Sequence, residues 1–450
     1  MLHKQKLNLF SFTMIVVGLV IGMGIFRTAA TSARDAIDPS VYFTAWILGG
    51  FVALCGALTY AEIGSRYPVT GGYYKVFSYA YHPSIAFAIN CIILISNAAS
   101  LSGVALIGSG YVTKLFAGYP WTDIHKALIS CAAIFLFYVI NLKGLRISAR
   151  AQNILMLIKI SMIVILIAAL FFPQYYADQS MADPAVNPSM SWIQSLGISL
   201  IAVSFTYGGY QQTINFGNEV NRPAQNIPKG IFIGITIIIV LYLLVNLSYY
   251  KLVGFQNMKG EREVAYVVIN KIFGKGGADV FSFFLFFGVL AYVNALLLSN
   301  PRVMYAMSTE GVMPKAFSRQ NHNEVLTVSL TVFAALCIII LFFAQTFEKI
   351  LNFTIFLDCF GMVASSATIF ILRKRTKHLD NTGIYKMKLF PLMPLIFIAA
   401  YMFVGVSIAI QTPEIALTGV AVLAGFVILY FITRNKNNVV TAGLGSGENA

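Results

Sequence analysis

The sequence Ile21-Gly22-Met23-Gly24-Ile25-Phe26 lies inside an apolar run that extends from about residue 10 to residue 30. Two glycines one residue apart therefore fall near the middle of a segment long enough to cross a membrane as a helix. Glycine lowers helix stability by about 1 kcal/mol relative to alanine and adopts backbone angles that other residues avoid. In lipid, a broken helix is stable only where protein or a polar ligand satisfies its free amides and carbonyls.

A second glycine pair, in Phe205-Thr206-Tyr207-Gly208-Gly209-Tyr210, interrupts another apolar run near its middle. Glycine is common wherever membrane helices pack closely. Interrupted helices at corresponding positions in two halves of a chain, however, are typical of transporter binding sites. The pair of interruptions therefore favours a binding site near the middle of the membrane.

Composition indicates the class of protein. Of the 450 residues, 58% are hydrophobic and 11% are charged, and the mean hydropathy is +0.77. Soluble domains carry about 25% charged residues, so we expect an all-α integral membrane protein in a lipid bilayer. The net charge of +14 does not indicate a nucleic-acid partner, because the basic residues form short clusters between apolar runs.

The sequence contains no signature of an enzyme or a metalloprotein. The five cysteines all fall in apolar runs, and the five histidines lie in termini or connections. No His, Cys and carboxylate residues occur at metal-ligand spacing, and no GxSxG, HExxH or P-loop motif is present. We therefore expect no catalytic residues, no metal and no cofactor.

Apolar runs of about 20 residues predict twelve membrane-spanning helices. Their approximate bounds are 10–31, 41–65, 83–115, 126–142, 147–172, 191–219, 228–253, 277–308, 325–343, 348–372, 389–410 and 414–433. An even number of spans places both termini on one side. Most of the 31 lysines and arginines lie in connections on that side, so both termini are predicted to be cytoplasmic.

Spans one to five and six to ten show the same order of features, and each set opens with an interrupted helix. Because five is odd, the second set must enter the membrane from the other side, which makes the repeat inverted. The predicted organisation is repeat 1 in residues 1–172, repeat 2 in 191–373, two further helices in 389–433 and a flexible tail in 434–450. The connection 254–276 is expected to hold a short amphipathic piece, Val264–Phe273.

The ends of the interrupted helices offer bare backbone groups to a ligand. An α-amino acid, with a carboxylate close to an ammonium group, suits two such ends. We expect amides of Met23, Gly24 and Ile25 to bind the carboxylate, and carbonyls of Ile21, Phe205 and Thr206 to bind the ammonium. Phe205 is a candidate gate over the ligand. The remaining candidates at the breaks are Gly22, Gly208 and the possible lining residues Tyr207 and Tyr210.

Lys159 lies more than ten residues inside the fifth predicted span. A lysine in hydrocarbon is costly, so its side chain should face the bundle interior or a cavity. There it can either exchange protons or act as a permanent cation where another transporter holds sodium. The structural alternative is a lysine that reaches the membrane surface along its own helix.

Other polar residues in the spans leave alternatives open. For Glu62 and Glu219, the favoured role is a cytoplasmic polar network that holds loops. The role of Asp358 is left open. Asn294 is either a hydrogen-bonding link between helices or a ligand contact. Ser96, Asn97 and Ser100 raise the same choice and favour a structural link.

Several motifs resemble those of the amino acid–polyamine–organocation transporters, near the L-amino-acid transporter branch. They are Val17 to Phe26, similar to G-x-x-I-G-x-G-I-F; Tyr60-Ala61-Glu62-Ile63 with Arg66-Tyr67-Pro68; Phe205 to Tyr210 with Glu219 and Asn221-Arg222-Pro223; Val293-Asn294-Ala295 with Arg302; and Phe356-Leu357-Asp358. They extend over both predicted repeats.

The resemblance implies a LeuT-like five-plus-five inverted repeat with broken helices 1 and 6, alternating access and no cofactor. It implies that Lys159 occupies the place of a sodium ion, that Asn294 lines the substrate pocket and that Phe205 gates it. Met23 departs from the small residue usual at its position, which suggests a narrower pocket. Residues 112–126 contain no cysteine, so we expect no disulfide-linked heavy chain and a stand-alone, bacterial-type protein of the inner membrane.

The leading hypothesis is sodium-independent transport of a neutral, small to medium L-α-amino acid, by proton symport or exchange. Protons are partners only in the first case. One alternative is a carrier of cationic amino acids or polyamines. An alternative of another class is a non-transporting receptor or a channel on the same fold.

Overall fold

The structure is a computed structural model that describes residues 6–22, 24–115, 119–172, 190–261, 263–343, 347–379 and 383–444. Its α-helices are α1 (Leu9–Val20), α2 (Gly24–Asp35), α3 (Pro39–Arg66), α4 (Gly72–Ala80), α5 (Pro83–Leu115), α6 (Asp123–Leu142), α7 (Leu145–Ala168), α8 (Trp192–Tyr207), α9 (Pro223–Val253), α10 (Phe255–Gly260), α11 (Val264–Thr309), α12 (Thr327–Phe343), α13 (Phe347–Arg375), α14 (Leu392–Gln411) and α15 (Pro413–Leu444). Short 3-10 helices are η1 (Ala169–Phe171), η2 (Tyr210–Asn215), η3 (Gly217–Glu219), η4 (Lys315–Ser318) and η5 (Lys377–Leu379). The described residues contain no β-strand, only two isolated bridges, so the predicted all-α class is confirmed.

Ten helical segments of the described residues are long and apolar enough to cross a membrane. The ninth predicted span coincides with a shorter apolar helix, Thr327–Phe342. The sixth coincides with α8, which has 16 residues and is followed by η2. Twelve crossings therefore stay a prediction, while a membrane protein with about ten long apolar helices is established.

Two of the predicted boundaries can be compared with the structure in detail. Val264–Phe273 is helical as predicted, and a non-helical residue, Gly274 (φ 70°, ψ −178°), separates it from the rest of α11. At the C-terminus, α15 continues to Leu444, where a flexible tail from residue 434 was expected. Residues 445–450 of that tail lie outside the described residues.

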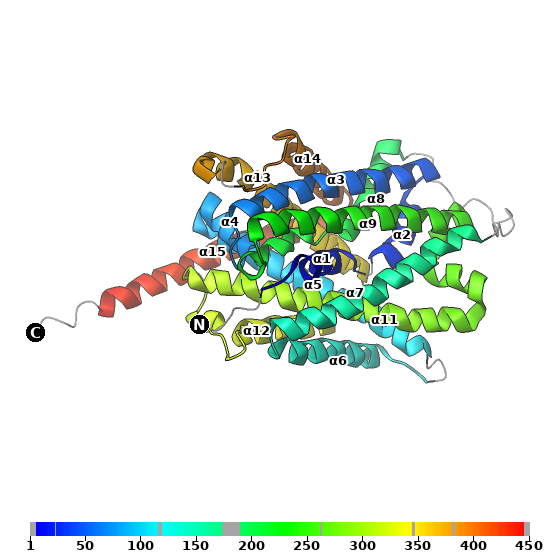
Figure 1. The fold of residues 1–450 in the computed structure, drawn as a ribbon, viewed down its shortest axis with the longest axis horizontal. Coiled ribbons are helices and arrows are strands. Elements are labelled where there is room, and N and C mark those ends of the chain that lie inside the picture. The colour runs from blue at the N-terminus through cyan, green and yellow to red at the C-terminus, as the bar shows by residue number, and fades with distance from the viewer. Residues whose placement is uncertain are drawn as a thin grey trace, which may run out of the picture.

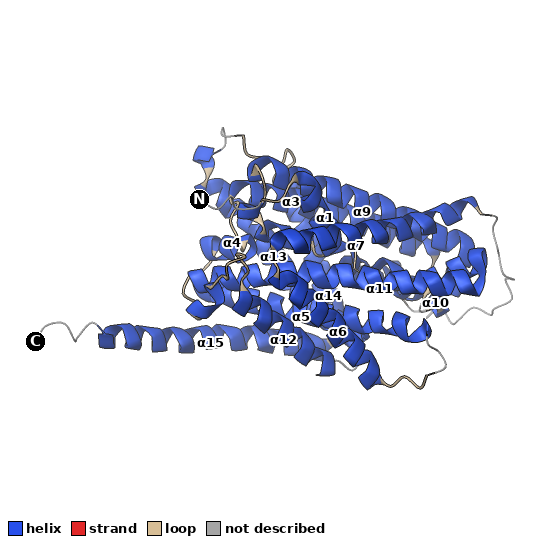
Figure 2. Ribbon diagram, turned by 60° about the horizontal axis from the view of Figure 1, so that its bottom comes forward, coloured by secondary structure: helices blue, strands red, loops and turns tan. Residues whose placement is uncertain are grey.

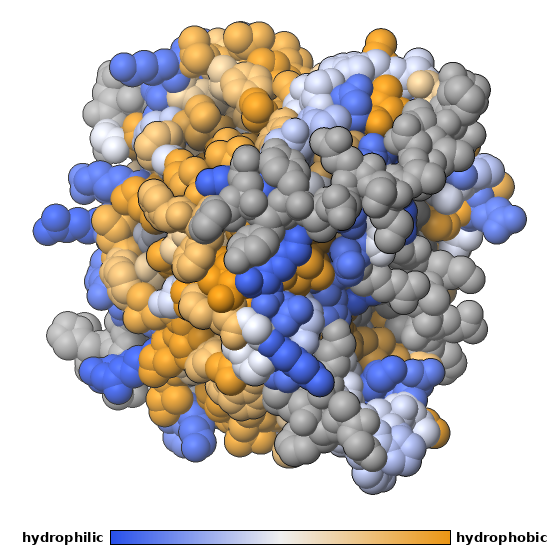
Figure 3. Space-filling model, turned by 90° about the vertical axis from the view of Figure 1, so that its right-hand side faces the viewer, coloured by the Kyte–Doolittle hydropathy of each residue, from blue (hydrophilic) through white to orange (hydrophobic). Residues whose placement is uncertain are grey.

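The helices run roughly along the long axis of the molecule, and both ends of the chain lie at the same end of this bundle (Figures 1 and 2). The long helix α11 packs against α5 and α7. Outer helices expose large apolar side chains, for example Phe135 on α6 and Ile410 on α14. The view of the end opposite the C-terminus shows hydrophilic residues beside a broad hydrophobic area (Figure 3). A bilayer around the bundle would cover the apolar flanks.

Helix starts follow local side-chain chemistry. The Asp38 carboxylate accepts a hydrogen bond from the Val41 amide at 3.0 Å, and Pro39 occupies the first turn of α3. The Ser40 hydroxyl also donates to Asp38, which lowers the pKa of that carboxyl below its ordinary value. At α8, Ser191 and Gln194 form a reciprocal capping box.

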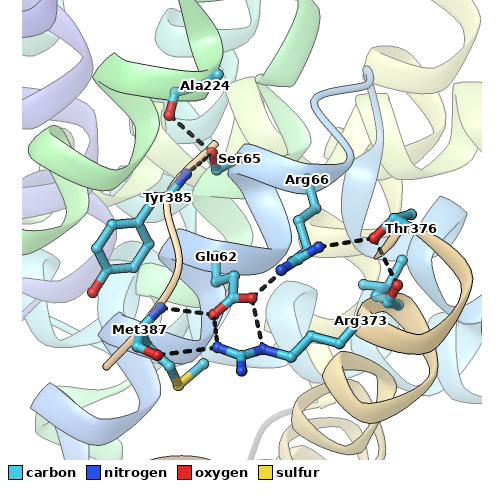
Figure 4. A network of polar contacts seen from close by, with 9 residues as sticks. Glu62, Ser65, Arg66, Ala224, Arg373, Thr376, Tyr385 and Met387 are labelled. Carbon is cyan, nitrogen blue, oxygen red and sulfur yellow. Dashed lines mark hydrogen bonds and ion pairs between the residues drawn. The ribbon is translucent and has the colours of Figure 1, made fainter. Parts of the chain in front are cut away.

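A buried ion network ties α3 to α13 and to the segment before α14 (Figure 4). The Glu62 carboxylate accepts from Arg66 Nε at 2.7 Å, from Arg373 Nε and Nη2 at 2.8 and 2.6 Å, and from the Met387 amide at 2.8 Å. The side chains of Glu62 and Arg66 are fully buried. Four donors on one carboxylate offset the cost of burying its charge.

A second pair lies between η3 and α11. Arg302 donates to both oxygens of Glu219, with distances of 2.8 and 2.6 Å. The backbone carbonyl of Glu219 accepts a hydrogen bond from the Leu7 amide at 2.6 Å, and the Asn221 amide donates to the Leu7 carbonyl at 2.9 Å. The start of the chain is therefore fastened to the segment that follows α8. The networks expected for Glu62 and Glu219 are both present.

Replacing Glu62 with alanine should strongly destabilise the protein, because two buried or half-buried arginines would lose their counter-charge. We expect a loss of about 3–5 kcal/mol, measured as a lowered apparent Tm in detergent. Glu310→Ala is the matched control, since it removes a partly exposed pair with Lys75 and should cost about 0–1 kcal/mol. Equal Tm shifts for the two variants would contradict this account.

Candidate functional site

The first helix break separates α1 from α2. Helix α1 ends at Val20, and Ile21 leaves helical geometry with φ −72° and ψ 84°. Met23 lies outside the described residues, and α2 begins at Gly24. The first amides of α2 have no partner within their own helix, so the break presents donors to whatever lies beside it.

Lys159 of α7 reaches this break. Its ammonium donates a hydrogen bond to the Ile21 carbonyl, and its side chain is fully buried. The aliphatic part is close to Gly288 of α11, where an added Cβ atom would lie 3.2 Å from Lys159 Cε. A cation at the carbonyl end of α1 is stabilised by the helix dipole. Lys159 therefore faces the bundle interior, as predicted.

The second break follows α8 and touches the first. Gly209 adopts φ +113°, which disfavours any side chain. A Cβ atom there would also lie 2.1 Å from the Leu19 carbonyl oxygen. The Tyr242 hydroxyl lies 3.4 Å from the carbonyl oxygens of both Val20 and Thr206. The two interrupted helices therefore meet at their breaks.

Hydroxyl groups join α2 to α8 beyond the breaks. Thr28 donates to the Gly24 carbonyl at 2.7 Å and is hydrogen-bonded to the Thr206 hydroxyl. Further along the same pair of helices, the Ser32 and Ser199 hydroxyls are 2.7 Å apart. This seam fixes Gly24 against Thr206, because a Cβ on Gly24 would lie 2.7 Å from Thr206 Oγ1 and 3.0 Å from its Cα.

A cavity lies beside the two breaks. Five of the predicted site residues line it: Gly22, Gly24, Phe205, Thr206 and Gly208. The other lining residues are Leu19, Val20, Asn97, Ser100, Val104, Ser204, Gly209, Gln211, Gln212, Tyr292, Ile355, Asp358, Met362 and Tyr401. The cavity thus combines backbone groups of the breaks with polar side chains from other helices.

Several predicted site residues lie outside this lining. Ile21 and Ile25 are fully buried, and the Ile21 carbonyl is bonded to Lys159. Tyr207 packs against Trp46 and Tyr242. Tyr210 is also buried and contacts Tyr60 edge-on.

Asn294 belongs to a separate polar cluster. It accepts from Asn141 Nδ2 at 2.9 Å and donates to Gln152 Oε1 at 2.8 Å and to the Ser148 carbonyl at 3.1 Å. These contacts join α11 to α6 and α7. The arrangement matches the structural-link alternative for Asn294.

Part of the cavity lining was not predicted from the sequence. Gln211 accepts from the Gly209 amide at 2.8 Å, and Tyr292 is hydrogen-bonded to Ser100 at 2.7 Å. Gln211 and Gln212 come two and three residues after the glycine pair, so their position after a break was a usable signal. Tyr292 and Tyr401 were indistinguishable in sequence from the many other aromatic residues of the spans.

Metal binding finds no support in the part of the chain that is described. No group of three or more His, Cys, Asp or Glu residues is placed there to hold a metal ion. The five cysteines are all free thiols.

The family of the chain follows from its similarity to known proteins. The profile of the amino acid permease family matches residues 7–433. The chain belongs to this family. It is therefore a multi-pass membrane transporter of the amino acid–polyamine–organocation superfamily and not an enzyme.

Individual relatives of this permease are similar over most of its length. The serine/threonine exchanger SteT of Bacillus subtilis is 26% identical over 96% of this chain and 98% of its own. The human large neutral amino acids transporter small subunit 2 is 22% identical over 95% of this chain and 80% of its own. The methylthioribose transporter of Bacillus subtilis is 27% identical over 70% of this chain and 69% of its own.

The two glycines of the first break provide a matched pair of variants. Gly24→Ala should destabilise the permease by about 1–3 kcal/mol, because its methyl group overlaps Thr206. In Gly22→Ala, the methyl group would lie 3.5 Å from the Tyr292 ring, an ordinary contact. We expect a clearly lower apparent Tm for Gly24→Ala alone. Equal apparent Tm values for the two variants would contradict the close approach of α2 and α8 at Gly24.

Proposed function

We propose that this permease transports a neutral, small to medium L-α-amino acid, independently of sodium and by alternating access. Its architecture would be a LeuT-like five-plus-five inverted repeat of twelve spans, with α1–α2 and α8–η2 as the broken first and sixth spans. Both termini would lie in the cytoplasm. Their location at one end of the bundle (Figure 1) supports an even number of crossings.

The observation that carries the proposal is the meeting of two helix breaks at one cavity. The substrate carboxylate would bind the free amides at the start of α2, where the helix dipole favours an anion. The Ile21 carbonyl accepts the Lys159 ammonium, whose charge would repel a second cation. The substrate ammonium is therefore assigned to the carbonyls of Phe205 and Thr206. These two carbonyls accept long hydrogen bonds from uncharged groups, the Gly208 amide at 3.3 Å and the Tyr242 hydroxyl at 3.4 Å. Phe205, which lines the cavity, would gate it.

Sodium independence is supported by Lys159. In transporters with broken helices, unwound carbonyls and half-helix ends coordinate the coupling ion. Here a lysine ammonium bonds the carbonyl at the end of α1. A fixed positive charge at that point would take the place of a sodium ion and repel any sodium ion that approached.

The transport mode can be tested with radiolabelled neutral amino acids in proteoliposomes without sodium. Accumulation driven by an inward proton gradient alone would establish symport. Uptake that needs unlabelled amino acid inside would establish exchange. A strict sodium requirement, or no saturable uptake in either condition, would refute the proposal. Flux without saturation or trans-stimulation would favour a channel on the same fold.

Removing the Lys159 ammonium should strongly reduce uptake while leaving the protein folded. In Lys159→Met the Ile21 carbonyl loses its buried donor, which costs about 1–3 kcal/mol, and the positive charge beside the break disappears. We expect uptake to fall at least about tenfold. Lys251→Met is the control, because Lys251 also donates to a helix-end carbonyl, that of Leu170 at 2.6 Å, away from the cavity. Equal uptake by the two variants would assign Lys159 a structural role only.

One observation favours a second candidate, a carrier of cationic amino acids or polyamines. Asp358 lines the cavity, so a carboxyl group is available to a positively charged substrate. Competition of neutral uptake by lysine and spermidine would measure this preference.

A further inference from the structure

The three acidic residues that the sequence placed in or beside spans have different surroundings. Glu62 accepts four hydrogen bonds from Arg66, Arg373 and the Met387 backbone (Figure 4). Glu219 accepts hydrogen bonds from Nε and Nη2 of Arg302. Asp358 accepts one hydrogen bond, from the Ser96 hydroxyl at 2.7 Å, and no ion pair to it occurs among the described residues. Only Asp358 of the three lines the cavity beside the breaks.

A carboxyl group inside a membrane protein is costly to bury and usually has a functional partner. A carboxyl group offers about four acceptor positions, and Ser96 takes one of them. The structure provides no arginine or lysine among the cavity-lining residues. The remaining acceptor capacity of Asp358 is therefore available to a ligand.

Asp358 lies on a different helix from the groups that would bind the amino and carboxylate groups of a substrate. The breaks belong to α1, α2 and α8, whereas Asp358 belongs to α13. Near it in the lining lie Ile355 of the same helix and the hydrogen-bonded pair Ser100 and Tyr292. These side chains come from α13, α5 and α11, so none of them belongs to a break.

We propose that Asp358 accepts a hydrogen bond from the substrate's side chain, so that the site selects small amino acids bearing a hydroxyl or ammonium group over their apolar isosteres. This inference rests on the proposed function, because it assumes that the breaks hold the main chain. It adds a residue that determines specificity and the chemical class of side chain that it recognises.

Isosteric pairs test the proposal in the unmodified protein. Threonine and valine differ only by a hydroxyl in place of a methyl group, as do serine and 2-aminobutyrate. In competition against a labelled transported amino acid, we expect threonine to bind about 10- to 100-fold more tightly than valine, the range of a hydrogen bond to an ionised group. A preference below about threefold would overturn the inference, even if neutral amino acids are transported.

Variants then assign the preference to Asp358. Asp358→Leu replaces the carboxyl group with a larger apolar side chain that accepts no hydrogen bond, so the threonine-to-valine ratio should approach one. Asp358→Asn retains an acceptor oxygen and should give an intermediate ratio. Glu310→Gln removes the charge of a partly exposed carboxyl that lies outside this cavity and should keep the ratio of the unmodified protein. An unchanged ratio in folded Asp358→Leu would refute the role of Asp358.

The failures of the two proposals can be told apart. If the unmodified protein takes up no L-amino acid, the proposed function fails. If it transports amino acids but does not distinguish the isosteres, only the role of Asp358 fails. Comparison of 2,3-diaminopropionate, with its side-chain amine protonated, with serine would show whether an ammonium or a hydroxyl is the better partner.

Discussion

The arrangement of the site depends on the bond between the Lys159 ammonium and the Ile21 carbonyl. Interrupting a helix in hydrocarbon leaves carbonyl groups that water cannot reach, and each needs a partner within the protein. Lys159 supplies one and adds a positive charge at the negative end of the α1 dipole. The glycines can therefore open the first helix at this depth without leaving its end unsatisfied.

The same constraint explains why the two breaks lie together. A backbone group left without its helical hydrogen bond can find a new partner in a neighbouring helix that is also interrupted or that carries a polar side chain. Tyr242 lies within reach of one carbonyl from each break, and Gly209 allows its backbone to approach Leu19. The hydroxyl seam from Thr28 to Ser199 continues this contact along α2 and α8. Packing and polar satisfaction thus select the same pairing of helices.

Charged residues are used in two different ways in this fold. At the end of the bundle that holds the termini, Glu62 and Glu219 are surrounded by arginine donors and hold segments together. Lys159 at the first break and Asp358 at the cavity have few partners. A network with every donor matched gives stability, whereas a partly satisfied charge inside a membrane protein points to a ligand or a moving ion.

The sequence by itself determined the membrane class, the approximate position of almost every long helix, and the breaks at Gly22–Gly24 and Gly208–Gly209. Hydrophobic length and glycine placement are local properties, so they can be read without knowing the fold. It also identified Lys159, because a lysine in an apolar run has few alternatives to the interior. Only the tertiary structure decided which side chains line the cavity. Asn294, Tyr207 and Tyr210 lie outside the lining, and Tyr292, Gln211 and Asp358 lie in it. The direction of a side chain depends on how each helix is rotated against its neighbours, and in a helix that is apolar on all sides the sequence does not specify this rotation.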